Sequence, residues 1–156
     1  MTASHALLKS LVTHVSNAAL GTLDGDSPFV SMTPFAITPD GQAVIVHVSR
    51  LAAHTRQMQA HPAVSLLVME PEIPGKMPQG LARVTIQGRA RVLSQNEPDY
   101  SVAKSQYLNK FPSASELFHF PDFQLVRIEV ISARLVGGFA QASSLTAETF
   151  ARAVRS

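Results

Sequence analysis

Residues 81–93 alternate between apolar and polar side chains over a stretch long enough for one extended β-strand. Such an alternation puts successive side chains on opposite faces of the strand. The apolar set is Val84, Ile86, Ala90 and Val92, and the polar set is Arg83, Thr85, Gln87, Arg89 and Arg91. A strand of this length is typical of a β-barrel, so residues 81–93 favour a barrel fold.

Five other segments have the composition of strands, and turn signals separate them. The turn signals are the sequences DGDS and TPDG and a loop rich in proline and glycine at residues 70–80. Six strands with few intervening helices favour an antiparallel barrel over a doubly wound sheet. We therefore predict a mainly β (α+β) fold, a six-stranded antiparallel β-barrel with flanking helices. The five segments are residues 18–23, 28–37, 43–48, 64–69 and 124–135.

Helices are predicted outside these strands. Apolar residues recur at helical spacing over residues 4–15, behind a Ser4 cap. A second helix spans residues 51–60 and ends at His61-Pro62. The remaining predicted features are a helix over 97–109, a compact aromatic segment over 111–123, a hinge at 137–139 and a partly helical polar tail.

Composition limits the class of protein. A chain of 156 residues with 46% hydrophobic and 15% charged residues fits one globular domain. The net charge is only +2 and the basic residues are scattered, so we expect no nucleic-acid partner. No stretch approaches the roughly 18 apolar residues of a membrane span, and the first residues lack a signal peptide. We therefore expect no membrane association and a cytoplasmic location.

The chain contains no cysteine. This absence excludes disulfides, iron–sulfur clusters, zinc–thiolate sites and cysteine nucleophiles. Redox chemistry would therefore need a bound cofactor.

Residues 46–56 have a layout that suits a phosphate group. A strand-like run ends at Ser49-Arg50 and passes directly into a helical segment that contains Thr55. A capping serine, the first free N–H groups of a helix, an arginine and a threonine hydroxyl can converge on one dianion. An ordinary strand-to-helix junction has the same pattern. Neither GxGxxG nor GxxxxGK occurs in the chain, so a phosphate would need a cradle of this other kind.

The polar face of residues 81–93 has two interpretations. Arg83, Thr85 and Gln87 share one parity, so they face the same space. In the first interpretation these side chains line a ligand site, and in the second they face solvent. Periodicity alone favours the second, because most small antiparallel sheets have a solvated outer face.

The histidines and aromatic residues carry simpler predictions. His47, His54 and His61 are spaced by seven, but His47 belongs to a strand, so they cannot share one helical face and we predict no metal site. The Gly137-Gly138 pair predicts a bend in the chain. Core packing, and not a platform for nucleic-acid bases, is expected of Phe111, Phe118, Phe120 and Phe123.

Five blocks, taken in their order and spacing, resemble the FMN-binding split barrels related to pyridoxamine 5'-phosphate oxidase. The resemblance is strongest to the branch that includes haem-utilisation proteins, and it covers most of the chain. The blocks are PFVSMTPF at 28–35, VSRLAAHTR at 48–56, HPAVSLLV at 61–68, ARVTIQGRA at 82–90 and ARLVGGF at 133–139.

This resemblance implies a single FMN-binding split-barrel domain over residues 1–156 that forms a homodimer, with FMN between the two subunits. It implies that the flavin phosphate contacts Ser49, Arg50, Thr55 and Arg83, with His54 in the same region. It also implies that the flavin ring lies along Ser31, Met32, His47 and Val48, with Gln87 as a hydrogen-bond partner and Gly138-Phe139 at its edge.

The implied function is that of an FMN-dependent oxidoreductase acting on an unidentified small molecule, with substrate groups from loop 70–80. A non-catalytic flavin- or haem-binding protein is the alternative, and a barrel that has lost its cofactor is a third reading. The chain ends without the arginine- and histidine-containing segment of the true oxidases, which argues against vitamin B6 oxidation. No histidine follows His119, which argues against haem oxygenase activity.

Overall fold

The computed structural model describes residues 2–138 and 141–156. Its strands form one antiparallel sheet in the order β2-β1-β5-β6-β7-β4-β3, with β8 paired to β7. The predicted α+β class is confirmed, whereas the predicted number of six strands is wrong, because the described residues form eight. The strands are β1 (Asn17–Asp24), β2 (Ser27–Pro34), β3 (Ala36–Ile37), β4 (Ala43–Ser49), β5 (Ala63–Met69), β6 (Arg83–Val92), β7 (Phe123–Val136) and β8 (Ala142–Thr146).

The sheet curls because one segment of the chain supplies both of its ends. Strands β2 and β3 lie at opposite ends of the strand order, yet only Phe35 separates them in sequence. Phe35 is fully buried, and its N–H donates to the carbonyl of Ser16 at 3.1 Å. The predicted single strand over residues 28–37 is therefore wrong: the segment crosses from one sheet edge to the other and wraps the sheet into a split barrel.

Strand β8 was not predicted from the sequence. Its five residues, ASSLT, are mostly exposed and pair with the second half of β7. Without an alternation of apolar and polar residues, the segment reads as a polar tail. The segment forms a strand because its backbone pairs with that of β7.

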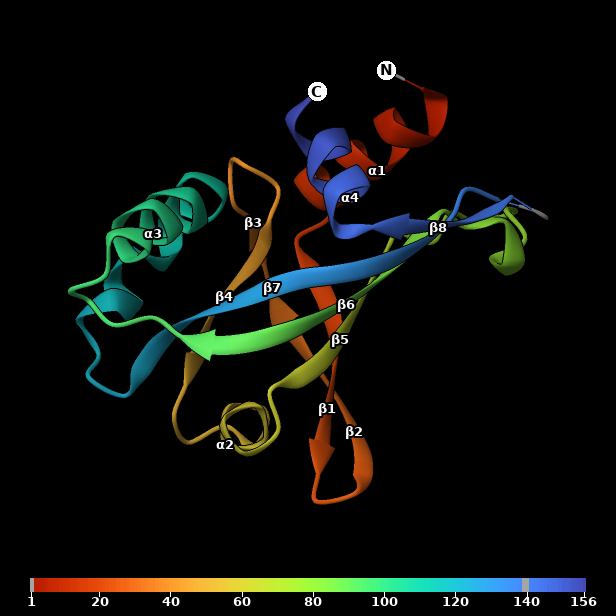
Figure 1. The fold of residues 1–156 in the computed structure, drawn as a ribbon. Coiled ribbons are helices and arrows are strands. Elements are labelled where there is room, and N and C mark those ends of the chain that lie inside the picture. The colour runs from red at the N-terminus through yellow and green to blue at the C-terminus, as the bar shows by residue number, and fades with distance from the viewer. Residues whose placement is uncertain (1, 139–140) are drawn as a thin grey trace.

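Helices cover both ends and one side of the curled sheet. In Figure 1, α1 (Ala3–His14) and α4 (Ala147–Arg155) lie side by side at one end, and α2 (Ala53–Ala60) lies at the opposite end. Helix α3 (Pro98–Lys110) packs beside β3 and β4. Thr2, and not the predicted Ser4, caps α1 by accepting the N–H of His5. Two short 3-10 helices are η1 (Pro78–Gly80) and η2 (Pro112–His119).

Both predicted tight turns are present. Asp24 pairs with Ser27 across a two-residue loop in which Gly25 has φ +64°. In the TPDG turn, Gly41 has φ +73°, and a Cβ atom there would lie 2.8 Å from the backbone of Ala151. Only glycine satisfies both conditions at position 41.

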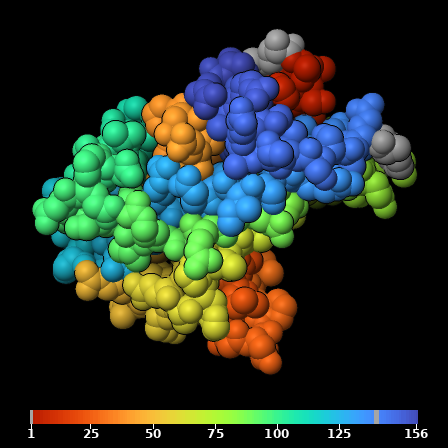
Figure 2. Space-filling view, in the orientation of Figure 1, coloured from red at the N-terminus to blue at the C-terminus, as the bar shows by residue number. Residues whose placement is uncertain are grey.

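Two apolar clusters stabilise the fold. The larger one fills the inside of the curl between α1, α4, Met58 of α2 and the inward side chains of the strands. The smaller one lies between β4 and α3 and includes Ile45, Leu125 and Tyr107. The outer face of β1, β2, β5 and β6 is not covered by any helix among the described residues. Figure 2 shows a recess on that side, between the β1–β2 hairpin and the projecting arm that contains β8.

Candidate functional site

Strand β4 ends where the phosphate site was predicted, but Ser49 does not cap a helix there. Its hydroxyl accepts the N–H of Leu51 at 3.1 Å and donates to the carboxylate of Asp122 at 3.2 Å. Helix α2 begins at Ala53, with Ala52 as an N-cap that makes no side-chain hydrogen bond. The prediction that the helix starts at residue 51 with a serine cap is therefore wrong. The carboxylate of Asp122, which accepts the hydrogen bond of the Ser49 hydroxyl, also repels a second anion at that hydroxyl.

Thr55 is buried inside the protein rather than turned to a ligand. Its side chain is 1% exposed, and its hydroxyl donates to the carbonyl of Ser49 at 2.5 Å. This bond holds the turn between β4 and α2 together. The neighbouring Arg50 fixes the same turn through its backbone, whose N–H donates to the carbonyl of Asp122 at 2.7 Å.

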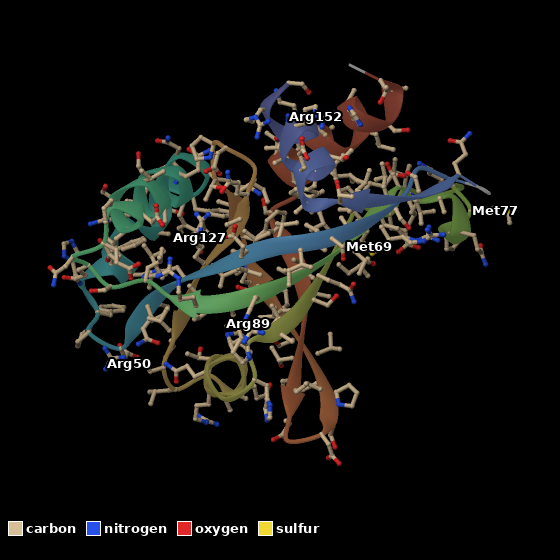
Figure 3. The ribbon with its side chains drawn as sticks, viewed as in Figure 1. Arg50, Met69, Met77, Arg89, Arg127 and Arg152 are labelled. Atoms are coloured by element: carbon tan, nitrogen blue, oxygen red, sulfur yellow. The ribbon has the colours of Figure 1, made fainter. Side chains whose placement is uncertain are left out.

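Arg83 lies far from Arg50 within one chain. Ser49 pairs with Phe123 near one end of β7, whereas Arg83 pairs with Val136 at the other end. The 13 residue steps of β7 between these two partners correspond to roughly 40 Å along the strand at the usual rise. In Figure 3, Arg50 is labelled at the lower left, whereas Met69, the sheet partner of Arg83, is labelled to the right of the centre. One chain therefore does not bring the four predicted phosphate ligands together.

His47 and Val48, which were predicted to lie along the flavin ring, point to opposite faces of β4. Val48 belongs to the inner core and is 3% exposed. His47 points to the opposite face of β4, where its ring stacks on Phe118 with centroids 3.8 Å apart and planes within 7°. Both residues are enclosed by protein, so neither lines an open site in this structure.

The surroundings of His47 disfavour its charged form. Burial, followed by the positive charge of Lys104, lowers the pKa of His47 to about 4. Its Nδ1 atom is buried and has no hydrogen-bond partner in the described residues. Phe111 and Phe118 pack against the smaller apolar cluster, between β4 and α3, which confirms core packing for these two rings. Phe120 is 51% exposed, so the same prediction is wrong for that residue.

Ser31 and His54 do come together. The Ser31 hydroxyl lies 2.9 Å from Nδ1 of His54, which links the inner face of β2 to α2. Burial lowers the pKa of His54. The next residue, Met32, is 62% exposed because it points to the outer face of β2.

The outer face of the sheet contains two adjacent recesses that meet at Gln87. One recess, of about 470 Å³, is mainly apolar and includes Gly21, Val30 and Ile131 in its lining. The other, of about 390 Å³, includes hydroxyl groups and the guanidinium of Arg134. Gln87 lines both, and its amide oxygen accepts from the Ser132 hydroxyl at 3.2 Å. The polar parity of β6 thus faces a continuous two-part hollow.

A β-bulge shapes the apolar part of this hollow. The register of β6 on β7 shifts between Gln87 and Gly88, and it leaves Ile131 without a sheet partner. Ile131, which has the same outward parity as Glu129, is 58% exposed. A Cβ atom on Gly88 would lie 2.6 Å from the carbonyl oxygen of Glu129, so close packing at the bulge requires glycine.

Positive charge borders the hollow. Arg83 and Arg89 lie on the outward parity of β6, and Arg134 lies opposite Thr85 on β7. In residues 2–138 and 141–156, none of these three arginines forms an ion pair with a carboxylate. The guanidinium of Arg134 donates to the Ser144 hydroxyl at 2.8 Å, and that of Arg83 donates to the carbonyls of Leu81 and Gln79. Arg134 lines the polar recess and gives it a positive charge that suits an anionic ligand.

Several residues of this face were missed in the sequence. Val30 and Ile131 are exposed apolar side chains that look like core residues in a strand pattern. Arg134 could have been found from the sequence, because the alternation of its strand places it on the outer face. Ser144 had none, because β8 was not predicted. Of the residues implied at the flavin edge, Gly138 has φ +141°, and Phe139 lies outside the described residues.

The family model described as pyridoxamine 5'-phosphate oxidase matches residues 5–137 of this chain. The chain belongs to that family. It is 40% identical over 116 residues to the non-canonical heme oxygenase HOZ, chloroplastic, of Arabidopsis thaliana, a match that covers 74% of this chain and 33% of HOZ. It is 27% identical over 131 residues to the heme oxygenase HutZ of Vibrio cholerae, covering 83% of this chain and 73% of HutZ.

A solved structure of a heme binding protein from Mycobacterium smegmatis has the same fold. The TM-score is 0.86 at 24% identity, over 97% of this chain and 61% of that chain. These matches place the protein in the branch of the oxidase family that includes HutZ and HOZ, as the sequence blocks predicted. The chain spans only about a third of the length of HOZ.

The described residues contain no group of three or more histidine or acidic side chains arranged to hold a metal ion. None of their helices is long and apolar enough to cross a membrane. The cytoplasmic location stays a prediction.

Proposed function

We propose that this member of the oxidase family binds haem in the two-part hollow of its outer sheet face. The observation that supports this proposal is that an apolar recess adjoins a polar recess lined by Arg134, an arginine without a carboxylate partner among the described residues. A haem has a flat apolar ring and two carboxylate groups, which match these two halves. The names of HOZ, HutZ and the mycobacterial protein support the same ligand.

The residues present fit the ring and the carboxylates of haem. Val30 and Ile131 supply apolar contact area, and Arg134 supplies a charge-assisted donor, a type of bond that contributes about 1.5 to 3 kcal/mol. No histidine lies on the strands of this face in the described residues, so a histidine that holds the haem iron would have to come from elsewhere. The bound haem would supply an iron centre capable of reacting with oxygen. The chain's own residues would orient its ring and hold its carboxylates.

A second copy of the chain would cover this face. Val30, Met32 and Ile131 are each more than half exposed on the same side of the sheet. Large apolar side chains gathered on one surface mark an interaction site in most proteins. A homodimer that encloses the ligand between its subunits would bury them.

An FMN-dependent oxidoreductase acting on a small molecule is the second candidate function. Arg83 and the Ser49-Arg50 turn are too far apart to hold one phosphate within a chain, but two copies in opposite orientation could bring them together. The phosphate of FMN would then contact Arg50 of one subunit and Arg83 of the other. In this reading Arg50 is essential, whereas in the haem reading it lies outside the ligand site.

Visible absorption titrations with hemin and with FMN test both candidates. We expect saturable hemin binding with a sharp Soret band, weakened about tenfold or more by Arg134→Ala and unchanged by Arg50→Ala. Arg152→Ala on α4, an exposed arginine paired with Glu148, is the matched control and should bind like the wild type. Loss of the Soret band on adding a chemical reductant in air would show turnover rather than binding alone.

The opposite pattern would replace the proposal. FMN binding that depends on Arg50, without hemin binding, would make the flavin oxidoreductase the working function. Binding of neither ligand would favour the third reading, a barrel that serves only in interactions with other proteins.

A further inference from the structure

Gly21 occupies the middle of β1 without a backbone reason to be glycine. The pairing of β1 with β2 runs without a break from Asn17 to Asp24, so Gly21 marks no bulge. Its φ lies outside the left-handed region. A Cβ atom there would lie 3.5 Å from the carbonyl oxygen of Ser65, which is ordinary van der Waals contact. Gly88 differs, since a Cβ atom there would overlap Glu129.

Glycine in the interior of a strand is unfavourable. It loses more conformational freedom on folding than other residues and has no side chain to pack. Where neither a bulge nor a tight bend explains such a glycine, close approach of another group is the remaining physical reason. The fold alone would therefore be better served by a larger residue at position 21.

The space that a side chain at position 21 would occupy adjoins the apolar recess, which Gly21 lines. Gly21 pairs with Val30 on β2 and with Ser65 on β5, and all three residues line the recess. Val30 and Ile131 project from either side of it, and they are 69% and 58% exposed. Ala63 and Ser65 contribute only small side chains to the lining. Small residues between two exposed apolar ones leave a gap into which a flat group can pack.

We infer that Gly21 is a specificity-determining residue that keeps the recess open for the flat apolar ring of the ligand. The inference rests on the proposed function, because it assigns a role within the same hollow. The ring would pack against the bare backbone of β1 at Gly21. Its acidic groups would extend past Gln87 toward Arg134, which lines the adjoining polar recess.

Fluorescence titration with protoporphyrin IX tests this inference without involving iron ligation. Gly21→Val should weaken porphyrin binding about 10- to 200-fold, the usual range for a steric misfit of this size in an apolar pocket. Its melting temperature should equal or exceed that of the wild type, because valine favours strands. A loss of binding together with retained stability separates a ligand role from a structural one.

Ala19→Val is the matched control. Ala19 lies two residues away on the same face of β1 but does not line the recess. The added valine there should leave porphyrin affinity unchanged. Sedimentation of all variants at the same concentration shows whether any loss of binding follows a loss of self-association instead, a result that would overturn the inference.

Wild-type binding with equal affinity in Gly21→Val overturns the inference and leaves the proposed function standing. If Gly21→Val does not fold, Gly21→Ala decides, because it adds only the Cβ atom for which the structure has room. Weaker porphyrin binding by that variant supports the inference, and unchanged binding overturns it. Failure of the wild type to bind hemin, protoporphyrin IX or FMN removes the proposed function and the inference together.

Discussion

Strands β4 and β2 are both apolar segments of the same sheet, but their surroundings differ. In β4, alternate side chains enter the inner core or the cluster under α3, so six of its seven residues are buried. In β2, Val30 and Met32 remain exposed because no helix covers the outer face. Apolar residues therefore stabilise the fold in one strand and form a binding surface in the other.

Truncating one residue in each strand would test this difference most directly. Ile45→Ala on β4 should destabilise the protein by about 2 to 5 kcal/mol, because it leaves a cavity between the sheet and α3. Val30→Ala on β2 should change stability by less than about 0.5 kcal/mol. Urea denaturation of both variants measures the two values. Similar losses would show that β2 is packed as tightly as β4.

The stability of the folded protein should depend on pH through His47 on β4. The pKa of His47 is about 4 in the folded protein, below the ordinary value of 6.5, so the unfolded chain binds this proton more readily. Stability should therefore fall as the pH drops from 6.5 to 4, by about 3 kcal/mol, and level off below pH 4. His47→Phe, which keeps a ring against Phe118, should remove this part of the pH dependence. Thermal melts from pH 7 to pH 3.5 measure it, and equal slopes in both proteins would contradict the prediction.

A charge on β2 should affect assembly rather than folding. Val30→Glu places a carboxylate on the face expected between two copies, where burial without a partner is costly. We expect self-association to weaken about tenfold or more while the melting temperature of the monomer stays near its original value. Sedimentation equilibrium measures the first quantity. A dimer unaffected by the glutamate would place the interface on another face.

The smallest expected effect concerns the inner side of β2. Ser31→Ala removes the contact between Ser31 and His54, a partly buried hydrogen bond worth about 0.5 to 1.5 kcal/mol. Thermal denaturation should show a corresponding small loss of stability. Ser27→Ala in the β1–β2 turn, where Ser27 is exposed, serves as a control and should have a smaller effect.

Most elements of the fold were predictable because their signals are local. The long strand β6 follows from an alternation within its own residues, and the turns at Gly25 and Gly41 follow from short motifs. The family followed from five blocks of sequence. The hydrogen bonds of Ser49 and Thr55 were not predictable from the sequence, because the first depends on the distant Asp122 and the second on the fold of the turn after β4.

The sequence by itself determined most of the helices and strands, the two tight turns and the family, because period, turn chemistry and motif spacing are properties of neighbouring residues. Tertiary structure alone decided which side chains remain open. His47 is covered by Phe118 and Gln87 is not, although both are polar residues in strands. Arg50 and Arg83 are separated by the length of β7. Burial and distance depend on pairing between segments far apart in the chain, and no local pattern of residues contains that information.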